Sequence, residues 1–177
     1  MNHDAKQMAR MTPYSPLSSL IAAARLRDDG NAVEFFDATF ADGLSAFEGI
    51  LDRANPSVVA IMEDNFNFLT KMCTARRRRD ALAMIEAAKA RGCRVLVNGP
   101  DSNDQPKPYL AAGADAVLAG DGEEALVEIA ATWHADPSAT LEAIAGLMLP
   151  SGARTRARLP QRRRRTPRSP SSSPTRS

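Results

Sequence analysis

Hydrophobic and polar positions along the chain follow two periods in turn, and these periods predict alternating helices and strands. Four segments repeat apolar residues every three or four positions, as amphipathic helices do. They are residues 15–29, 43–54, 70–91 and the segment that follows Gly122. Four short apolar runs of the kind that forms strands lie among them. They are residues 32–36, 57–62, 94–98 and 115–119.

The first predicted helix has signals at both ends. Ser15 is a candidate N-cap, Pro16 suits the first helical position, and Gly30 suits the C-terminal stop. The buried face of this helix is expected to carry Leu17, Leu20, Ile21 and Ala24. Further along, residues 99–107 are interpreted as a loop and residues 108–114 as a short helix that ends at Gly113.

Strands that alternate with helices of ten or more residues predict a parallel sheet with right-handed crossovers. We therefore expect an α/β fold with a doubly wound, Rossmann-like (flavodoxin-like) sheet. Such a sheet usually opens with a central strand before the first helix, but residues 1–14 contain no apolar run. The first strand is expected to be missing or degenerate: either the N-terminal segment builds a poor substitute, or the chain begins late relative to its relatives.

Composition changes abruptly near Pro150 and divides the chain. Residues 1–11 are interpreted as an N-terminal extension and residues 12–149 as one α/β domain. Residues 150–177 are rich in Arg, Pro and Ser, with Leu159 as the one large aliphatic residue, and we expect them to be disordered. This tail has three interpretations: RNA contact or a nuclear-type signal, a tail without a selected role, or coding sequence translated out of frame.

The net charge of +2 conceals two halves of opposite sign. Nine of the 23 Lys and Arg residues follow Pro150, where no acid occurs, so residues 1–150 carry 14 bases, 21 acids and a net charge of −7. An acidic body repels phosphate backbones, which makes nucleic-acid binding by the domain an unfavoured prediction. No apolar run approaches the roughly 18 to 20 residues of a membrane span, and the N-terminus has no apolar signal core, so a cytoplasmic location without membrane contact is expected.

The sequence contains no organised catalytic or metal-ligating set. Two cysteines, Cys73 and Cys93, cannot supply the ligands of a zinc or iron–sulfur site, and His3 and His134 are isolated from other ligand types. Phosphate-loop, dinucleotide and nucleophile motifs are absent. We expect no catalytic residues and no enzyme activity of this chain alone.

Two charged groups allow alternative interpretations. Asp121, Glu123 and Glu124 could act as a carboxylate group, although acids in a helix's first turn also complement its dipole. The four arginines of residues 76–79 could bind phosphate or a partner, although four consecutive residues spread around a helix and suit a solvated surface.

Polar, glycine-containing loops follow the predicted strands. In a parallel sheet, ligands bind outside the carboxyl ends of the strands, where these loops converge. Gly99, Gly120 and Gly122 would let a bulky ligand approach the backbone without a Cβ clash. The alternative is that these glycines only form tight strand-to-helix turns.

Four blocks of sequence carry a resemblance to a known family. They are Tyr14-Ser15-Pro16-Leu17, the apolar run at residues 58–61, Val95-Leu96-Val97-Asn98-Gly99-Pro100, and Ala114-Asp115-Ala116-Val117-Leu118-Ala119-Gly120-Asp121-Gly122-Glu123. Over residues 12–131 the chain resembles the N-terminal cobalamin-binding domain of cobalamin-dependent radical S-adenosylmethionine enzymes. The last block is the most specific, because the family ends its last strand with Gly-Glu-Gly-Glu; Asp121 replaces the first glutamate here.

The resemblance implies a corrinoid across the carboxyl ends of the strands, with its nucleotide tail beside the sheet. The family usually lacks the Asp-x-His-x-x-Gly motif that supplies a histidine to cobalt, and this chain lacks it too, so no metal ligand is expected. By resemblance, the corrinoid site comprises Asn65, Asn67, Gly99, Pro100, Asp101, Ser102, Gly120, Asp121, Gly122 and Glu123.

The three-cysteine motif of the family's catalytic barrel is absent, so no iron–sulfur cluster is expected in this chain. The resemblance therefore implies a module that positions the corrinoid, either as a truncated product or as the partner of a separate radical S-adenosylmethionine barrel protein. An alternative is a receiver-like signalling or interaction module of similar fold. A receiver needs a lysine after its last strand, however, and none follows Leu118. A third alternative, a nucleic-acid binder, depends on the basic tail alone.

Overall fold

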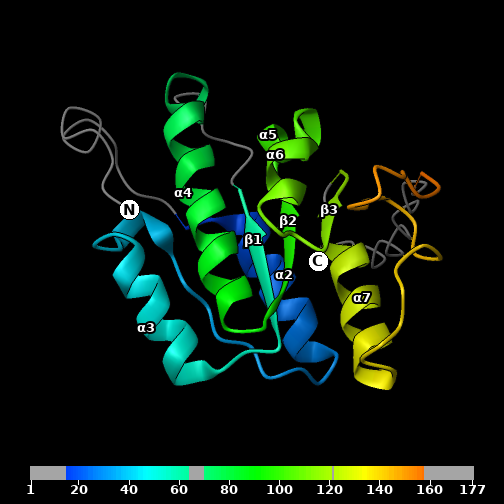
Figure 1. Cartoon of the computed structure of the whole chain (residues 1–177). Coiled ribbons are helices and arrows are strands. Elements are labelled where there is room, and N and C mark those ends of the chain that lie inside the picture. The colour runs from blue at the N-terminus through cyan, green and yellow to red at the C-terminus, as the bar shows by residue number, and fades with distance from the viewer. Residues whose placement is uncertain (1–14, 64–69, 121, 158–177) are drawn as a thin grey trace, which may run out of the picture.

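A computed structural model describes residues 15–63, 70–120 and 122–157 of the chain. They form an α/β fold with one open, mostly parallel sheet and helices packed around it (Figure 1). The strand order is β1-β2-β3-β4, and the first three strands are parallel. The strands are β1 (Val58–Met62), β2 (Arg94–Asn98), β3 (Ala116–Leu118) and β4 (Leu147–Met148).

The register brings the carboxyl ends of the three parallel strands to one level. Met62 of β1 is the partner of Asn98 of β2, and Asn98 is in turn the partner of Leu118 of β3. The turns that leave these strands therefore start side by side. This confirms the prediction of a shared edge for the turns after β2 and β3, whereas the loop after β1 lies, beyond Glu63, outside the described residues.

Most predicted helices are confirmed to within a residue or two. The helices are α2 (Leu17–Asp28), the 3-10 turn η1 (Ala38–Phe40), α3 (Leu44–Ala54), α4 (Thr70–Ala90), α5 (Pro100–Asp104), α6 (Pro106–Ala111) and α7 (Glu123–Ala135). Two details differ from the prediction. Pro16, not Ser15, occupies the N-cap of α2. The predicted loop at 99–107 contains α5, because Pro100 is pre-organised for a first helical turn.

Side chains of the central strands alternate between two hydrophobic clusters, one on each face of the sheet. Val95 and Val97 of β2 pack with α3 and α4, whereas Leu96, between them, packs with α7. β3 alternates in the same way. The continuous apolar runs of the sequence are thus explained, because both faces of these strands are covered.

The predicted buried face of α2 is wrong. Leu17, Leu20 and Ile21 are exposed, and Ala22 is the buried residue of this helix. α2 has apolar or small residues around most of its circumference, so periodicity alone did not identify the packed face. The small side chain of Ala22 allows close packing in the cluster that also contains residues of α7.

The predicted strand at 32–36 is not a strand in the structure. These residues are extended but belong to no ladder, and Val33 and Phe35 are exposed. Their β-branched and aromatic composition favours a strand, but within the described residues no neighbouring strand lies beside them to accept hydrogen bonds.

The sheet continues beyond the last strand that the sequence predicted. β4 runs antiparallel to β3, with Val117 opposite Met148. Residues 150–157 then fold back along β4, where the amide of Thr155 donates to the carbonyl of Leu147 over 2.9 Å. The sequence placed the start of the disordered tail at Pro150, whereas the described chain continues in the domain to Ala157.

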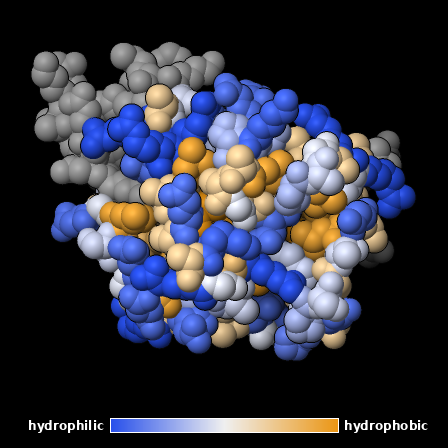
Figure 2. Space-filling view, in the orientation of Figure 1, coloured by the Kyte–Doolittle hydropathy of each residue, from blue (hydrophilic) through white to orange (hydrophobic). Residues whose placement is uncertain are grey.

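The surface seen in the direction of Figure 1 is mixed, with apolar side chains visible between polar ones (Figure 2). No helix in the described ranges is both long and apolar enough to cross a membrane.

Candidate functional site

The structure places the described part of the predicted site in two neighbouring turns. Gly99, Pro100, Asp101 and Ser102 lie in the turn from β2 into α5 and in α5 itself. Gly120, Gly122 and Glu123 lie in the turn from β3 into α7. Asn65, Asn67 and Asp121 lie outside the described residues. Seven of the ten residues thus lie at the carboxyl edge, as the sequence predicted.

One buried amide ties the two turns together. Nδ2 of Asn98, the last residue of β2, donates to the carbonyl of Leu118 and to the carbonyl of Gly120, each over 2.9 Å. The Asn98 side chain is buried, so both donors are committed to these carbonyls. The sequence analysis missed Asn98 as a site residue. The available signal was an amide that ends an otherwise apolar strand.

The three glycines of the site have different structural roles. A Cβ at Gly122 would lie 2.7 Å from Nδ2 of Asn98, and a Cβ at Gly99 would clash with the side chain of Glu63. Gly120, with φ of +69°, has no atom within 4 Å of a built Cβ. Gly99 and Gly122 therefore accommodate neighbouring side chains, and Gly120 alone faces open space. The sequence predicted that a bulky ligand could approach the backbone at all three glycines, but the side chain of Glu63 covers Gly99.

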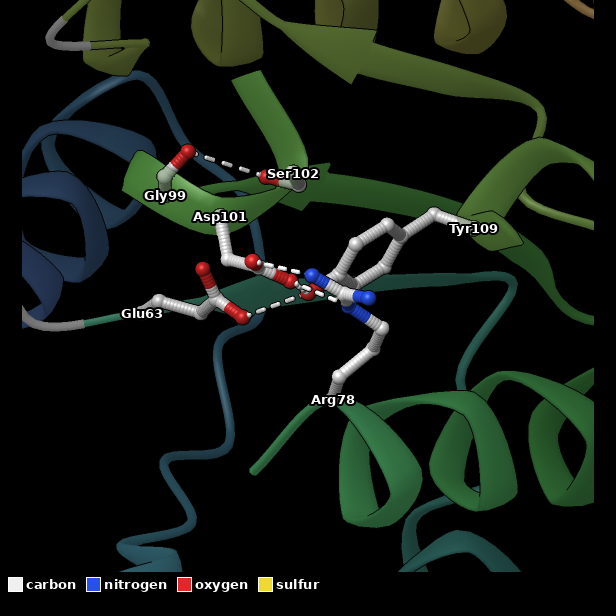
Figure 3. Close-up of polar contacts among 6 residues, drawn as sticks. All are labelled: Glu63, Arg78, Gly99, Asp101, Ser102 and Tyr109. Atoms are coloured by element: carbon white, nitrogen blue, oxygen red, sulfur yellow. Dashed lines mark hydrogen bonds and ion pairs between the residues drawn. The ribbon is translucent and has the colours of Figure 1, made fainter. Parts of the chain in front are cut away.

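A cluster of four polar side chains lies beside Gly99, three from the helices α4, α5 and α6 and one from Glu63, the residue that follows β1 (Figure 3). The phenol oxygen of Tyr109, from α6, lies 2.9 Å from Oε1 of Glu63 and 2.7 Å from Oδ2 of Asp101. Arg78 of α4 donates from Nε and Nη2 to the two Asp101 oxygens, each over 2.6 Å. We call Glu63, Arg78, Asp101 and Tyr109 the acid–tyrosine cluster.

Within the acid–tyrosine cluster, the pKa values of the two carboxyl groups are shifted in opposite directions. The hydrogen bonds from Arg78 lower the pKa of Asp101, and the phenol of Tyr109 lowers it further. Burial raises the pKa of Glu63, and the charge of Asp101 adds to this rise, while Tyr109 and the nearby backbone amides oppose it. Burial and both carboxyl groups raise the pKa of Tyr109, so its phenol keeps its proton.

The number of protons available in this cluster determines which groups donate and which accept. Tyr109 has one phenol proton but two carboxyl neighbours. Asp101 is held as a carboxylate by Arg78 and accepts that proton in a hydrogen bond. The contact with Glu63 is then satisfied when Glu63 is protonated and donates to the phenol oxygen. The raised pKa of Glu63 agrees with this arrangement.

Two residues predicted to line the ligand site are instead engaged within the protein. Asp101 is paired with Arg78, and the buried Ser102 donates from Oγ to the carbonyl of Gly99 over 3.1 Å. Arg78 belongs to the arginine run at 76–79, whose other exposed members include Arg76 and Arg79. The sequence suggested either phosphate or partner binding or a solvated surface for this run, and neither interpretation included an ion pair within the domain.

At this edge, the described residues present main-chain groups and mostly neutral or acidic side chains to which a cofactor could bind. Within those parts of the chain, no group of three or more His, Cys, Asp or Glu side chains gathers as metal ligands. Among the described residues at this edge, Gly120 has no atom within 4 Å of a built Cβ, and Pro100 is exposed.

Comparison of the chain with protein families, with curated proteins and with solved structures gives no match.

Proposed function

We propose that this chain is a cobalamin-binding module that holds a corrinoid over the carboxyl ends of β1, β2 and β3. The proposal includes the finer assignment of the fold as a doubly wound, flavodoxin-like sheet. It also includes the absence of catalysis by the chain alone, with a separate radical S-adenosylmethionine barrel protein as partner. The sequence resemblance over residues 12–131 supplies the ligand class.

The observation that carries the proposal is the joining of the two glycine turns by Asn98. Its amide fixes the carbonyls of Leu118 and Gly120, so the β3–α7 turn is held at the end of β2. Gly120 is left exposed with open space above its α-carbon. A ring that lies against this turn would meet the backbone of Gly120, with no side chain of the described residues within 4 Å of a built Cβ there.

The polar side chains would act on the rim of the ring. The corrin periphery carries amide groups, which donate and accept hydrogen bonds, and the half-buried Glu63, whose pKa is raised by burial, offers a carboxyl group beside Gly99. Cobalamin, when bound, supplies a cobalt centre that can carry a methyl group. The residues of this chain would orient the ring and leave one of its faces open.

Uptake of hydroxocobalamin by the purified full-length chain tests the proposal. The protein is incubated with the corrinoid and desalted, and the retained corrinoid absorbance is measured. Gly120→Leu introduces a side chain into the open space above the turn, and we expect it to reduce retention at least tenfold. Wild-type protein should retain the corrinoid with a shifted spectrum.

Gly152→Leu is the matched control for backbone strain. Gly152 also has a positive φ, +82°, and also has nothing within 4 Å of a built Cβ, but it lies in the turn after β4. Both substitutions thus carry the same conformational cost, and retention should fall only in Gly120→Leu. A folded wild-type chain that takes up no corrinoid, or equal loss in both variants, overturns the proposal.

A further inference from the structure

A slot lies along the outer edge of β1 and is distinct from the carboxyl edge discussed above. β1 is at one end of the described sheet, and the extended residues 32–36 run along it at a distance without pairing (Figure 1). The two segments line opposite sides of a cavity of about 660 Å³. We call this cavity the β1 slot.

The main chain of β1 has hydrogen-bonding groups directed into this slot. The amide of Arg94 donates to the carbonyl of Ser57 over 2.9 Å, and the amide of Glu63 donates to the carbonyl of Asn98 over 2.8 Å. In a parallel ladder, alternate residues bond to the same neighbour, so residues 57, 59, 61 and 63 face β2. Val58, Ala60 and Met62 therefore direct their N–H and C=O groups into the slot.

These groups have no strand partner within the described residues. No hydrogen bond joins β1 to residues 32–36 there, and Ala60 is exposed in the middle of the strand. An edge strand with unpaired main-chain groups is a template for an added strand. Residues 32–36, which have strand-forming composition, offer a second unpaired edge across the slot.

The walls of the slot match a strand that is covered on both faces. Phe47 and Leu51 of α3 lie on one side, and Leu126 and Trp133 of α7 lie on the other. Both helical layers thus continue past β1. At standard spacings, a five-residue strand with its side chains occupies roughly 800 Å³, which is close to the volume of the slot.

The chemistry of the slot selects an uncharged, apolar segment. Among the described residues that line it, Glu34, Arg94 and His134 are the only ionisable ones, and the rest are apolar, small or neutral. A charged side chain placed there would lose hydration without a partner. A strand with β-branched or aliphatic residues on both faces meets no such cost.

Residues 1–14, 64–69 and 158–177 do not have the composition of such a segment. Every five-residue window of residues 1–14 contains a charged side chain, from Asp4, Lys6 or Arg10. Residues 158–177 consist mainly of Arg, Pro and Ser, and residues 64–69 are needed to connect β1 to α4. A second copy could offer its own β1 edge, but that edge is part of a sheet and residues 32–36 obstruct its entry.

We propose that the β1 slot binds an extended apolar segment of another polypeptide chain, which adds to the sheet as a strand beside β1. Main-chain hydrogen bonds to Val58, Ala60 and Met62 would supply affinity, and the two helical layers would select aliphatic side chains. This interaction surface is independent of the corrinoid proposal, because it uses the edge of the sheet and not its carboxyl end.

A peptide with the sequence of residues 57–62 is a suitable probe, since it has no charged side chain and its strand residues are apolar on both faces. The peptide carries a fluorescent label, and its anisotropy is measured as the full-length chain is added, without corrinoid. We expect saturable binding. A second peptide with proline in place of the central alanine should bind at least tenfold more weakly, because proline lacks an amide proton and distorts the strand.

Two variants of the protein locate the binding edge. Ala60→Pro removes the N–H that points into the slot but leaves the ladder between β1 and β2, since proline is tolerated on an edge strand in this orientation. We expect it to weaken peptide binding at least tenfold. Ala60→Ser keeps the N–H at the same exposed position and should bind within twofold of wild type.

Hydrogen exchange separates the other possible occupants. The Ala60 amide should exchange rapidly in the free chain and slowly with bound peptide, while the Ile61 amide, which faces β2, should be slow in both. An Ala60 amide already protected in a monomer would mean that residues 1–14 occupy the slot. Protection in a dimer would mean that a second copy does. Either result, or no peptide binding by folded protein, overturns the proposal.

Discussion

The phenol oxygen of Tyr109 lies 2.9 Å from Oε1 of Glu63, although 45 residues separate the two positions in the chain. The same oxygen lies 2.7 Å from Oδ2 of Asp101. One phenol therefore links two carboxyl groups whose pKa values move in opposite directions, since Arg78 lowers that of Asp101 and burial raises that of Glu63. This relationship leads to the first two predictions.

The free energy of unfolding of Glu63→Gln should rise relative to that of wild type as the pH increases. The raised pKa of Glu63 favours its protonated form in the folded state, so its contribution is complete below the unfolded pKa of roughly 4.3. That contribution is lost as the pH rises through the folded pKa. The neutral glutamine amide can still donate to Tyr109, so the variant avoids this loss.

Urea denaturation of wild type and Glu63→Gln at several pH values between 4 and 8 measures this effect. The difference in free energy of unfolding should shift in favour of the variant with increasing pH. Glu86→Gln, at an exposed position of α4, is the control, because it makes the same substitution outside the acid–tyrosine cluster. A Glu63→Gln difference that is constant over this range would falsify the proton assignment.

Tyr109→Phe should destabilise the domain by about 1.5–3 kcal/mol, the range for a hydrogen bond to a charged group. The substitution removes the donor to Asp101 and leaves the half-buried Glu63 without its phenol partner. Ser138→Ala is the control, because it deletes an exposed hydroxyl that donates to Asp136 over 2.7 Å. It should cost less than about 0.5 kcal/mol in the same denaturation experiment. Equal losses would contradict a special role for the buried phenol.

Asn98→Leu should cost roughly 2–4 kcal/mol, because the buried carbonyl of Leu118 and the partly buried carbonyl of Gly120 both lose this donor. The control is Asn31→Leu, which removes one partly buried bond to the carbonyl of Leu26, a group that also accepts from the Asn31 backbone amide. We expect a clearly smaller loss there. Chemical denaturation of both variants checks the prediction, and a tolerated Asn98→Leu would mean that the two turns are held by other contacts.

Gly122→Ala should destabilise the protein more than Gly152→Ala. Both positions have a positive φ and share the backbone cost, but only the Cβ at 122 would lie within 2.7 Å of Asn98. The extra loss should be roughly 1–3 kcal/mol, as for other overpacked sites. The double variant Asn98→Ala with Gly122→Ala removes the clash, so the two losses should be less than additive. Strict additivity would show that Asn98 does not contact Gly122.

Much of the fold could be predicted from the sequence because its signals are local. The runs at 57–62 and 94–98 are apolar because both of their faces are covered, and that pattern is visible in one chain without any partner. Gly30, Pro56 and Gly92 mark element ends through their own backbone preferences. The shared edge of Gly99 and Gly120 followed from the rule that parallel strands end together.

The strand at 32–36 and the buried face of α2 could not be predicted in this way. Strand propensity describes how residues fit into a sheet, but a ladder also requires a neighbour, and the edge of β1 lies across a cavity from this segment. In α2, apolar residues exceed what one face can bury, so tertiary packing selected Ala22. The antiparallel β4 has only two residues, too few for a periodic signal.

The sequence by itself determined most of the order of helices and strands, although it wrongly predicted a strand at 32–36 and missed β4. It also determined the parallel direction of β1, β2 and β3 and the edge at which they end, because each of these depends on periodicity or on backbone preference. Only the tertiary structure decided that Glu63, Arg78, Asp101 and Tyr109 form one cluster, that Asn98 joins two turns and that β1 borders a slot. These features depend on distances between side chains and main-chain groups far apart in the chain, which no local pattern encodes.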